Sequence, residues 1–107
     1  MTKGVILSNL ARARLVEIQS WSLSRWGAKR TGTYMDDMLD RIDALAAGEL
    51  QGRSARRLID ATAAADLMIL GVASHYAIYT ETDENIVVLD ICHEKQNLAA
   101  LIDQLFD

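Results

Sequence analysis

The first half of the chain contains one short apolar run followed by apolar residues at helical spacing. Gly4–Leu7 is the short run, and it predicts an edge strand. The spaced residues fit one face of a helix, which Ser8 or Asn9 would cap and Gly27 would end. This helical stripe consists of Ala11, Leu15, Ile18, Ser22 and Trp26.

A second helix is predicted over Lys29–Ala47, and Gly48 follows at the position of a helix end. Because the connection between the two helices is very short, they are expected to form an antiparallel hairpin. The buried stripe of the second helix consists of Tyr34, Met38, Ile42 and Leu45.

The second half contains three apolar runs separated by short polar connections. Ile86–His93 is rich in β-branched residues, which predicts a central strand with a neighbour on each side. Its acidic residue, Asp90, is expected near the exposed side of the strand. Leu67–Val72 and Tyr76–Thr82 predict two further strands, so the three runs form an antiparallel meander.

Three segments carry weaker patterns. Gln51–Arg57 is polar and fits a solvated connector or, through its three arginines, an anion-binding patch. Asp60–Asp66 is alanine-rich and fits either a loop or a helical turn. From Asn97 onward the spacing predicts a short amphipathic C-terminal helix with the stripe Leu98, Leu101, Ile102 and Leu105.

The expected fold class is therefore α+β. An N-terminal edge strand and an antiparallel helical hairpin would pack on a small antiparallel sheet, in the order β-α-α-β-β-β with a short C-terminal helix. A length of 107 residues fits one domain over residues 1–107.

The charge and the cysteine content indicate which classes of protein and which cellular compartment fit this sequence. The formal net charge of −4 argues against a protein that coats nucleic acid. Residues 1–57 hold ten Lys and Arg against six Asp and Glu, whereas residues 58–107 hold one Lys against nine Asp and Glu. A single cysteine, Cys92, forms no internal disulfide, and no apolar run suits a signal peptide or a membrane span. We therefore expect a reducing cytoplasm.

The order of elements, read with specific residues, resembles the ParE toxins of the ParE/RelE toxin superfamily. The resemblance covers nearly the whole chain and runs without a gap through Arg53. Five pieces occur in order at the family's spacing. They are the first-helix pattern ending in Trp26-Gly27, the second-helix pattern with Leu45-Ala46, the pair Gly52-Arg53, Ser74-His75 followed by Ile78-Tyr79, and the strand end from Ile91 to Leu98.

This resemblance implies the toxin of a bacterial type II toxin–antitoxin pair, of the kind known from plasmid stabilisation. ParE toxins act on DNA gyrase, where they stabilise a cleaved DNA complex and block replication, and a ParD-like antitoxin neutralises them. Neither interaction requires catalysis, so we expect no enzyme activity and no catalytic residues, metal or cofactor. We also expect no membrane contact and no direct sequence-specific binding to nucleic acid.

Two alternatives remain open. The RelE branch of the superfamily cuts messenger RNA on the ribosome, which requires acid–base groups and cations against the phosphorane. No Lys or Arg lies between Leu58 and Glu94, although arginines of the first half could reach a site there. A relative that binds an antitoxin without being toxic is favoured by Thr80, where family members commonly carry Arg.

The remaining candidate residues are interpreted one by one. His75 and His93 are expected to be structural residues. Cys92 and His93 are adjacent in a strand, so their side chains point to opposite faces and cannot bind one metal ion together. The tryptophans fit either the core rim or anchors for an antitoxin. The candidate antitoxin-binding residues are Trp21, Trp26, Met35, Leu39, Arg12 and Arg14, and the candidate target-binding residues are Tyr79, His93, Lys95 and Asn97.

Overall fold

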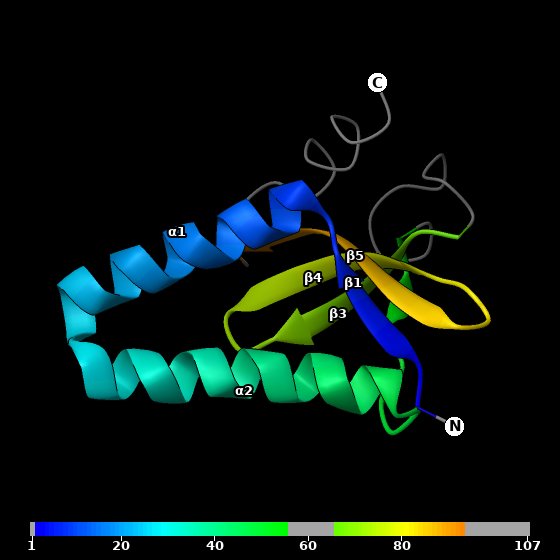
Figure 1. Cartoon of the computed structure of the whole chain (residues 1–107), viewed down its shortest axis with the longest axis horizontal. Coiled ribbons are helices and arrows are strands. Elements are labelled where there is room, and N and C mark those ends of the chain that lie inside the picture. Colours follow the sequence, from blue (N-terminus) through cyan, green and yellow to red (C-terminus); the bar gives the residue numbers. More distant parts are fainter. Residues whose placement is uncertain (1, 56–65, 94–107) are drawn as a thin grey trace.

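The computed structural model describes residues 2–55 and 66–93. Within these ranges the chain forms two long helices and a sheet, and both helices lie on one face of the sheet (Figure 1). The elements in chain order are β1 (Gly4–Leu7), α1 (Asn9–Trp26), α2 (Ala28–Ala46), β2 (Arg53–Ser54), β3 (Met68–Val72), β4 (His75–Glu81) and β5 (Asn85–His93).

The five strands form one mixed sheet in the order β1-β5-β4-β3-β2. The predicted meander of β3, β4 and β5 is confirmed, and β5 lies between two neighbours as expected. The expectation of a purely antiparallel sheet is wrong, because the edge strand β1 pairs with β5 in parallel. The predicted polar connector Gln51–Arg57 also contains a short strand, β2, which pairs with β3.

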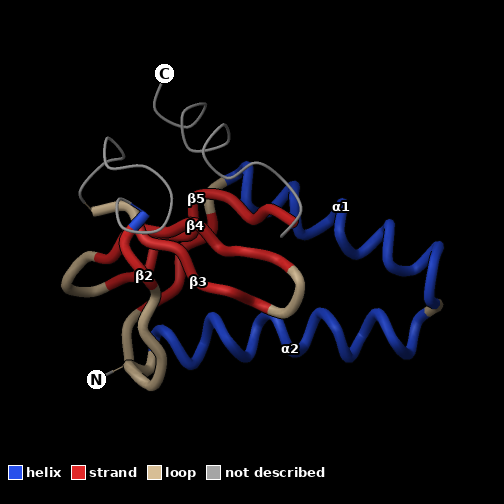
Figure 2. The backbone as a smooth tube through the Cα atoms, turned by 180° about the vertical axis from the view of Figure 1, so that it is seen from behind, coloured by secondary structure: helices blue, strands red, loops and turns tan. Residues whose placement is uncertain are grey.

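The helical hairpin is confirmed, and local chemistry accounts for its bounds. Ser8 caps α1, since its side-chain oxygen accepts a hydrogen bond from the backbone N–H of Ala11 at 3.0 Å. Gly27 has φ 83°, a backbone conformation that suits glycine, and it both ends α1 and precedes α2. Figure 2 shows the two helices meeting at a tip that extends beyond the sheet. The second helix runs one residue earlier at each end than predicted.

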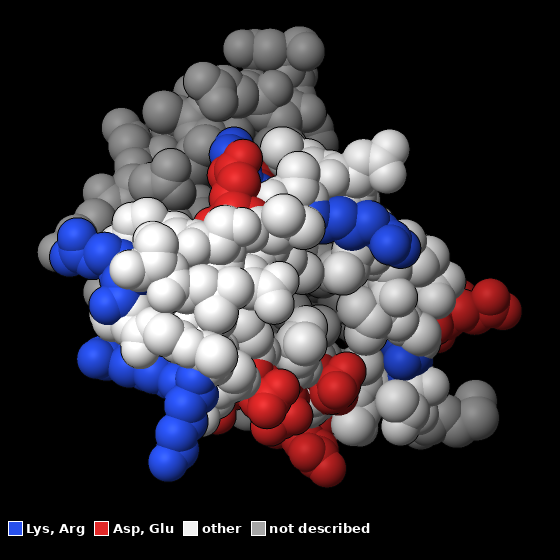
Figure 3. Space-filling view, turned by 60° about the vertical axis from the view of Figure 1, so that its left-hand side comes forward, with Lys and Arg blue, Asp and Glu red and all other residues white. Residues whose placement is uncertain are grey.

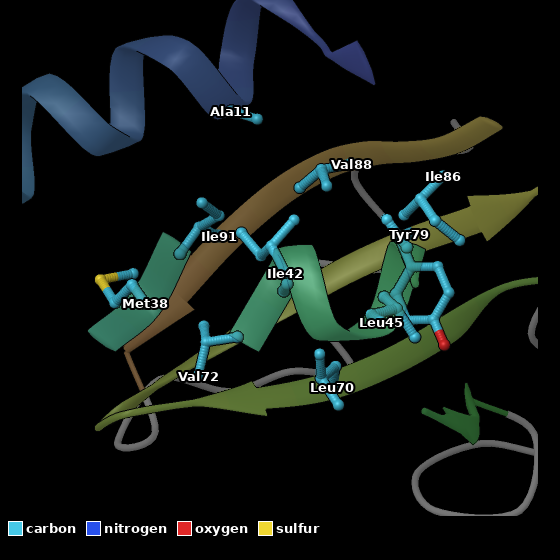
Figure 4. Packing of buried hydrophobic residues seen from close by; sticks show 12 residues of the cluster. Ala11, Met38, Ile42, Leu45, Leu70, Val72, Tyr79, Ile86, Val88 and Ile91 are labelled. Atoms are coloured by element: carbon cyan, nitrogen blue, oxygen red, sulfur yellow. The ribbon is translucent and has the colours of Figure 1, made fainter. Parts of the chain in front are cut away.

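The main core fills the space between the helices and the sheet (Figure 4). The predicted stripe of α2 is largely confirmed, since Met38, Ile42 and Leu45 are buried while Tyr34 is half-buried. These side chains pack against alternate residues of β3, β4 and β5. Burying a side chain such as Ile42 contributes about 2–3 kcal/mol to stability, so this cluster is the main source of tertiary structure.

Asp90 lies beside a bulge in β5 and is buried, against expectation. The residues Ile78 and Tyr79 of β4 pair with Asp90 and Val88, so Leu89 is an extra residue in β5. Asp90 is only 2% exposed, so the prediction that it lies near the exposed side of the strand is wrong. Its carboxylate accepts hydrogen bonds from Arg14 at 3.2 Å and from the backbone N–H of Ile91 at 2.7 Å, which compensate for its burial.

A second buried cluster consists of Ala55, Leu67, Ile69, Ile78 and Cys92. Ile78 alternates with core residues of β4, so this cluster belongs to the sheet face turned away from the helices. The predicted C-terminal helix and all of Asp60–Asp66 except Asp66 lie outside the described residues.

Candidate functional site

A pocket of about 620 Å³ lies where the helical hairpin meets the end of the sheet. Helix α1 and helix α2 form one wall, and the β3–β4 turn with the end of β5 forms the other. The described lining residues are Glu17, Ile18, Trp21, Ser22, Trp26, Tyr34, Ser74, His75 and His93. Most of the exposed area of this lining is apolar, which is typical of sites that bind apolar groups with a few polar contacts.

Five rings follow one another through this pocket in edge-to-face contact. The centroid distances are 5.4 Å from Trp21 to Trp26, 5.6 Å from Trp26 to Tyr34, 5.8 Å from Tyr34 to His75 and 5.0 Å from His75 to His93. Edge-to-face pairs at these distances stabilise one another beyond their buried area. The pocket therefore has an ordered aromatic wall that connects both helices to the sheet.

Hydrogen bonds fix the centre of this row. The hydroxyl of Tyr34 lies 2.5 Å from Nδ1 of His75, and it accepts a hydrogen bond from the backbone N–H of Ser74 at 3.2 Å. The turn before His75 contains Ala73 with φ 59°, an unusual conformation for alanine that helps to present this N–H. His75 and His93 are register partners on β4 and β5, so the sheet itself brings the two imidazoles together.

Cationic side chains stack on the two tryptophans. The guanidinium of Arg25 lies 5.3 Å from the Trp21 ring centroid, and that of Arg30 lies 4.5 Å from the Trp26 ring centroid. Figure 3 shows an uncharged area in the middle of the view, with basic groups at its left and right margins and acidic groups above and below it. The pocket opening thus combines exposed aromatic surface, with Trp21 at 53% exposure, and positive charge.

Ser22 is a polar residue inside the pocket wall. It is 1% exposed, and its hydroxyl has no hydrogen-bond partner among the described residues. A buried hydroxyl without a partner costs about 1–3 kcal/mol. A bound group that reached this hydroxyl would recover part of that cost.

The candidate antitoxin-binding residues fall in three places. Trp21 and Trp26 both line the aromatic pocket, so one partner could contact both rings. Leu39 is 42% exposed on α2, whereas Met35 is half-buried and packs against the main core, so the expected exposure of Met35 is wrong. Arg12 is exposed near the start of α1, and Arg14 is engaged with Asp90 and Glu17.

The candidate target-binding residues are not brought together within the described part of the chain. His93 lines the pocket. Tyr79 is 1% exposed, and its hydroxyl accepts a hydrogen bond from the backbone N–H of Gly52 at 3.0 Å, so it offers no ring surface to a partner. Lys95 and Asn97 lie outside the described residues.

Sequence reasoning did not identify Tyr34 and His75 as parts of the site. Tyr34 fitted the buried stripe of α2, and His75 was treated as an isolated structural residue. The available signal was the short meander: once its turn is placed at Ala73-Ser74, His75 and His93 become cross-strand neighbours. That register was not assigned from the sequence.

The described residues offer no cluster of metal ligands, and the thiol of Cys92 is buried. No three His, Cys, Asp or Glu side chains in residues 2–55 and 66–93 are placed to hold a metal ion. Burial and the nearby Asp90 carboxylate raise the pKa of the Cys92 thiol to about 11, which leaves it protonated at neutral pH. Burial likewise raises the pKa of Tyr79. No described helix is long and apolar enough to cross a membrane.

The sequence and the fold of this chain were compared with those of known proteins. A search of curated protein sequences finds no match. Nine chains of solved structures match. One of them, named "Chromosomal ParDE TA system from P. aeruginosa", has a TM-score of 0.67 and 16% identity, with 86% of this chain and 96% of that chain covered. At this identity the likeness shows that the fold is shared.

A family model gives the assignment itself. The model described as the ParE toxin of the type II toxin-antitoxin system, parDE, matches residues 5–98. This range includes all the helices and nearly all the strand residues described above, together with every described residue of the pocket. The chain therefore belongs to the ParE toxin family of type II toxin–antitoxin systems.

Proposed function

We propose that this chain is a toxin that inhibits DNA gyrase in the bacterial cytoplasm and that a ParD-like antitoxin neutralises it. The observation that carries the proposal is the match of the ParE toxin family model to residues 5–98. The similar solved structure from P. aeruginosa is that of a ParDE system, which supports a protein antitoxin as the partner here.

The aromatic pocket is the part of this chain best suited to an antitoxin. Protein interfaces concentrate their binding energy in aromatic and Arg anchors beside well-formed pockets. Trp21 and Trp26 supply such surface, while Arg25 and Arg30 add positive charge at the opening. We therefore propose that an apolar side chain of the antitoxin enters the pocket and that acidic residues beside it meet these arginines.

In the aromatic pocket the lining fits docking of a protein partner better than cleavage of RNA. Cleaving RNA would require cations against the developing phosphorane. The described residues that line the pocket include no Lys or Arg, and Glu17 contributes a carboxylate that would repel phosphate.

The proposal is tested by expression with and without the antitoxin. Expression of the toxin alone should arrest growth and induce the response to DNA damage. Co-expression of a ParD-like protein from the neighbouring gene should restore growth. Growth arrest without DNA damage would contradict gyrase as the target, while harmless expression with tight antitoxin binding would support the non-toxic relative.

One observation favours the ribosome-dependent ribonuclease as a second candidate. The rings of His75 and His93 lie 5.0 Å apart in the same pocket, and a pair of imidazoles can act as acid and base. Under this alternative, translating ribosomes with the toxin would yield cut messenger RNA, and His93→Gln would abolish the cutting. Intact messenger RNA would exclude it.

A further inference from the structure

A second hollow, of about 360 Å³, lies at the outer edge of β3 beyond the end of the short strand β2. It shares no lining residue with the aromatic pocket. Arg41 reaches it from α2, Gln51 and Arg53 from the segment that contains β2, and Ile69, Gly71 and Tyr76 from β3 and β4. Two cationic side chains from different elements therefore line one hollow.

The sheet register explains how this hollow arises. Arg53 pairs with Ile69, and Gly71 pairs with Tyr76, so all four residues belong to the sheet face turned away from the helices. Arg41 reaches the hollow from the α2 side at the edge of β3, where Gly71 has no partner in β2. A Cβ added to Gly71 would meet nothing within 4 Å. The missing side chain of Gly71 thus leaves open space beside its register partner Tyr76, which a larger residue would fill.

Arg41 is held in place at the rim of the hollow. Its Nε donates a hydrogen bond of 2.7 Å to the carbonyl oxygen of Gly71, which leaves the two terminal amino groups of the guanidinium for another partner. Neither Arg41 nor Arg53 forms an ion pair within the described part of the chain. Two such guanidinium groups match the fork geometry and negative charge of a phosphate group.

We propose that this hollow is an oxyanion site that binds a phosphate group through Arg41 and Arg53. Arg41 would bind the phosphate oxygens with its terminal amino groups while Gly71 holds its Nε. The phosphate group is either free, as in a nucleotide, or part of a nucleic-acid backbone, which would add contact with DNA irrespective of its sequence. The site uses none of the residues of the aromatic pocket that is proposed for the antitoxin, so the two sites can be tested separately.

The test follows the Nε–H signals of the arginines by NMR in the purified full chain at low salt. The chain is titrated separately with inorganic phosphate, a nucleoside monophosphate and a short DNA duplex of arbitrary sequence. The Arg41 signal should shift and saturate with at least one of these. Saturation with either small ligand assigns a free phosphate group, and saturation with the duplex alone assigns a backbone phosphate.

Variants separate the site from general charge attraction. Arg53→Gln should weaken binding about tenfold or more, because a charge-assisted hydrogen bond to phosphate is lost. Arg12→Gln is the matched control, since exposed Arg12 also donates its Nε to a backbone carbonyl, that of Leu7, and lies outside the hollow. Arg53→Lys retains the charge and should bind more tightly than Arg53→Gln.

Two results would overturn the proposal. One is a linear, unsaturated shift of the Arg41 and Arg12 signals together with all three ligands. The other is an affinity for phosphate that Arg53→Gln and Arg12→Gln leave equally unchanged.

Discussion

Arg14 on α1 and Asp90 on β5 form an ion pair, with 3.2 Å between Nε and Oδ1, although they lie 76 positions apart in the chain. Asp90 is 2% exposed, whereas about a third of the Arg14 side chain is accessible to solvent. Burial tends to lower the pKa of Arg14, but its charge interaction and hydrogen bond with Asp90 outweigh that effect and raise it. The pair therefore fixes the helix to the central strand through a carboxylate that water barely reaches.

Replacing Arg14 by Ala should destabilise the fold by about 2–3 kcal/mol, because it leaves the buried Asp90 carboxylate without its cation. This cost lies toward the low end for such pairs because solvent reaches the guanidinium. Glu17→Gln breaks only the exposed pair with Arg14 and should cost less than about 1 kcal/mol. Urea unfolding of both variants measures the difference. Equal effects would show that the Asp90 contact adds no stability.

Gly52 has a close neighbour that forbids a side chain. A Cβ there would meet the hydroxyl of Tyr79, and it would lie 2.8 Å from the carbonyl oxygen of Ile69. Gly52→Ala should therefore destabilise the protein by about 1–3 kcal/mol. Gly32 in α2 has open space, so Gly32→Ala should stabilise the protein by about 0.5–1 kcal/mol through helix propensity. Thermal unfolding of the two variants should shift in opposite directions, and a shared direction would contradict the packing described.

Much of this fold was predictable because it depends on local patterns. The stripes of both helices, the Ser8 cap, the helix end at Gly27 and the three-stranded meander all follow from periodicity and capping chemistry. The strand β2 was not predictable, since two residues, Arg53 and Ser54, carry no periodicity. Nor does a four-residue apolar run reveal that β1 lies parallel to β5.

The candidate site was predictable only in part, because its geometry depends on register. Trp21 and Trp26 come from one helix, but their spacing of five is neither of the spacings, three and four, that place side chains side by side, so the contact of their rings was not predictable from spacing. The meeting of His75 with His93 depends on the turn that sets the pairing of β4 and β5. The environment of Asp90 was likewise not predictable: as the one acidic residue of an apolar run it was expected near the exposed side, whereas it is buried and pairs with Arg14, which lies 76 positions away in the sequence.

Stability should depend on pH through Cys92. Its pKa is about 11 in the folded protein against 9.0 as the ordinary value, first because of burial and then because of Asp90. Below pH 9 both states keep the proton. Between about pH 9 and pH 11 only the unfolded state loses it, so the free energy of unfolding falls.

The measurement is urea unfolding at about pH 8 and about pH 10, for the parent protein and for Cys92→Ala. The parent should lose about 1 kcal/mol more than the variant over this interval. Identical losses would show that the thiol titrates alike in the folded and unfolded states.

The aromatic pocket should contribute more to antitoxin binding than other exposed apolar surface on the same helix. Trp21→Ala should weaken binding by about 2 kcal/mol or more if this ring is an anchor. Val16 is 62% exposed on α1 and does not line the pocket, so Val16→Ser is the matched control, with an expected effect below about 0.5 kcal/mol. Titration calorimetry with the ParD-like antitoxin measures both. Comparable losses would mean that the antitoxin binds elsewhere.

The claim that this chain acts by binding DNA gyrase has one direct test, a supercoiling assay with purified gyrase, plasmid and toxin. The account predicts that excess toxin stops supercoiling and that cleaved DNA accumulates, and that adding the ParD-like antitoxin first prevents both. Normal supercoiling with excess toxin, and no cleaved DNA, would contradict it.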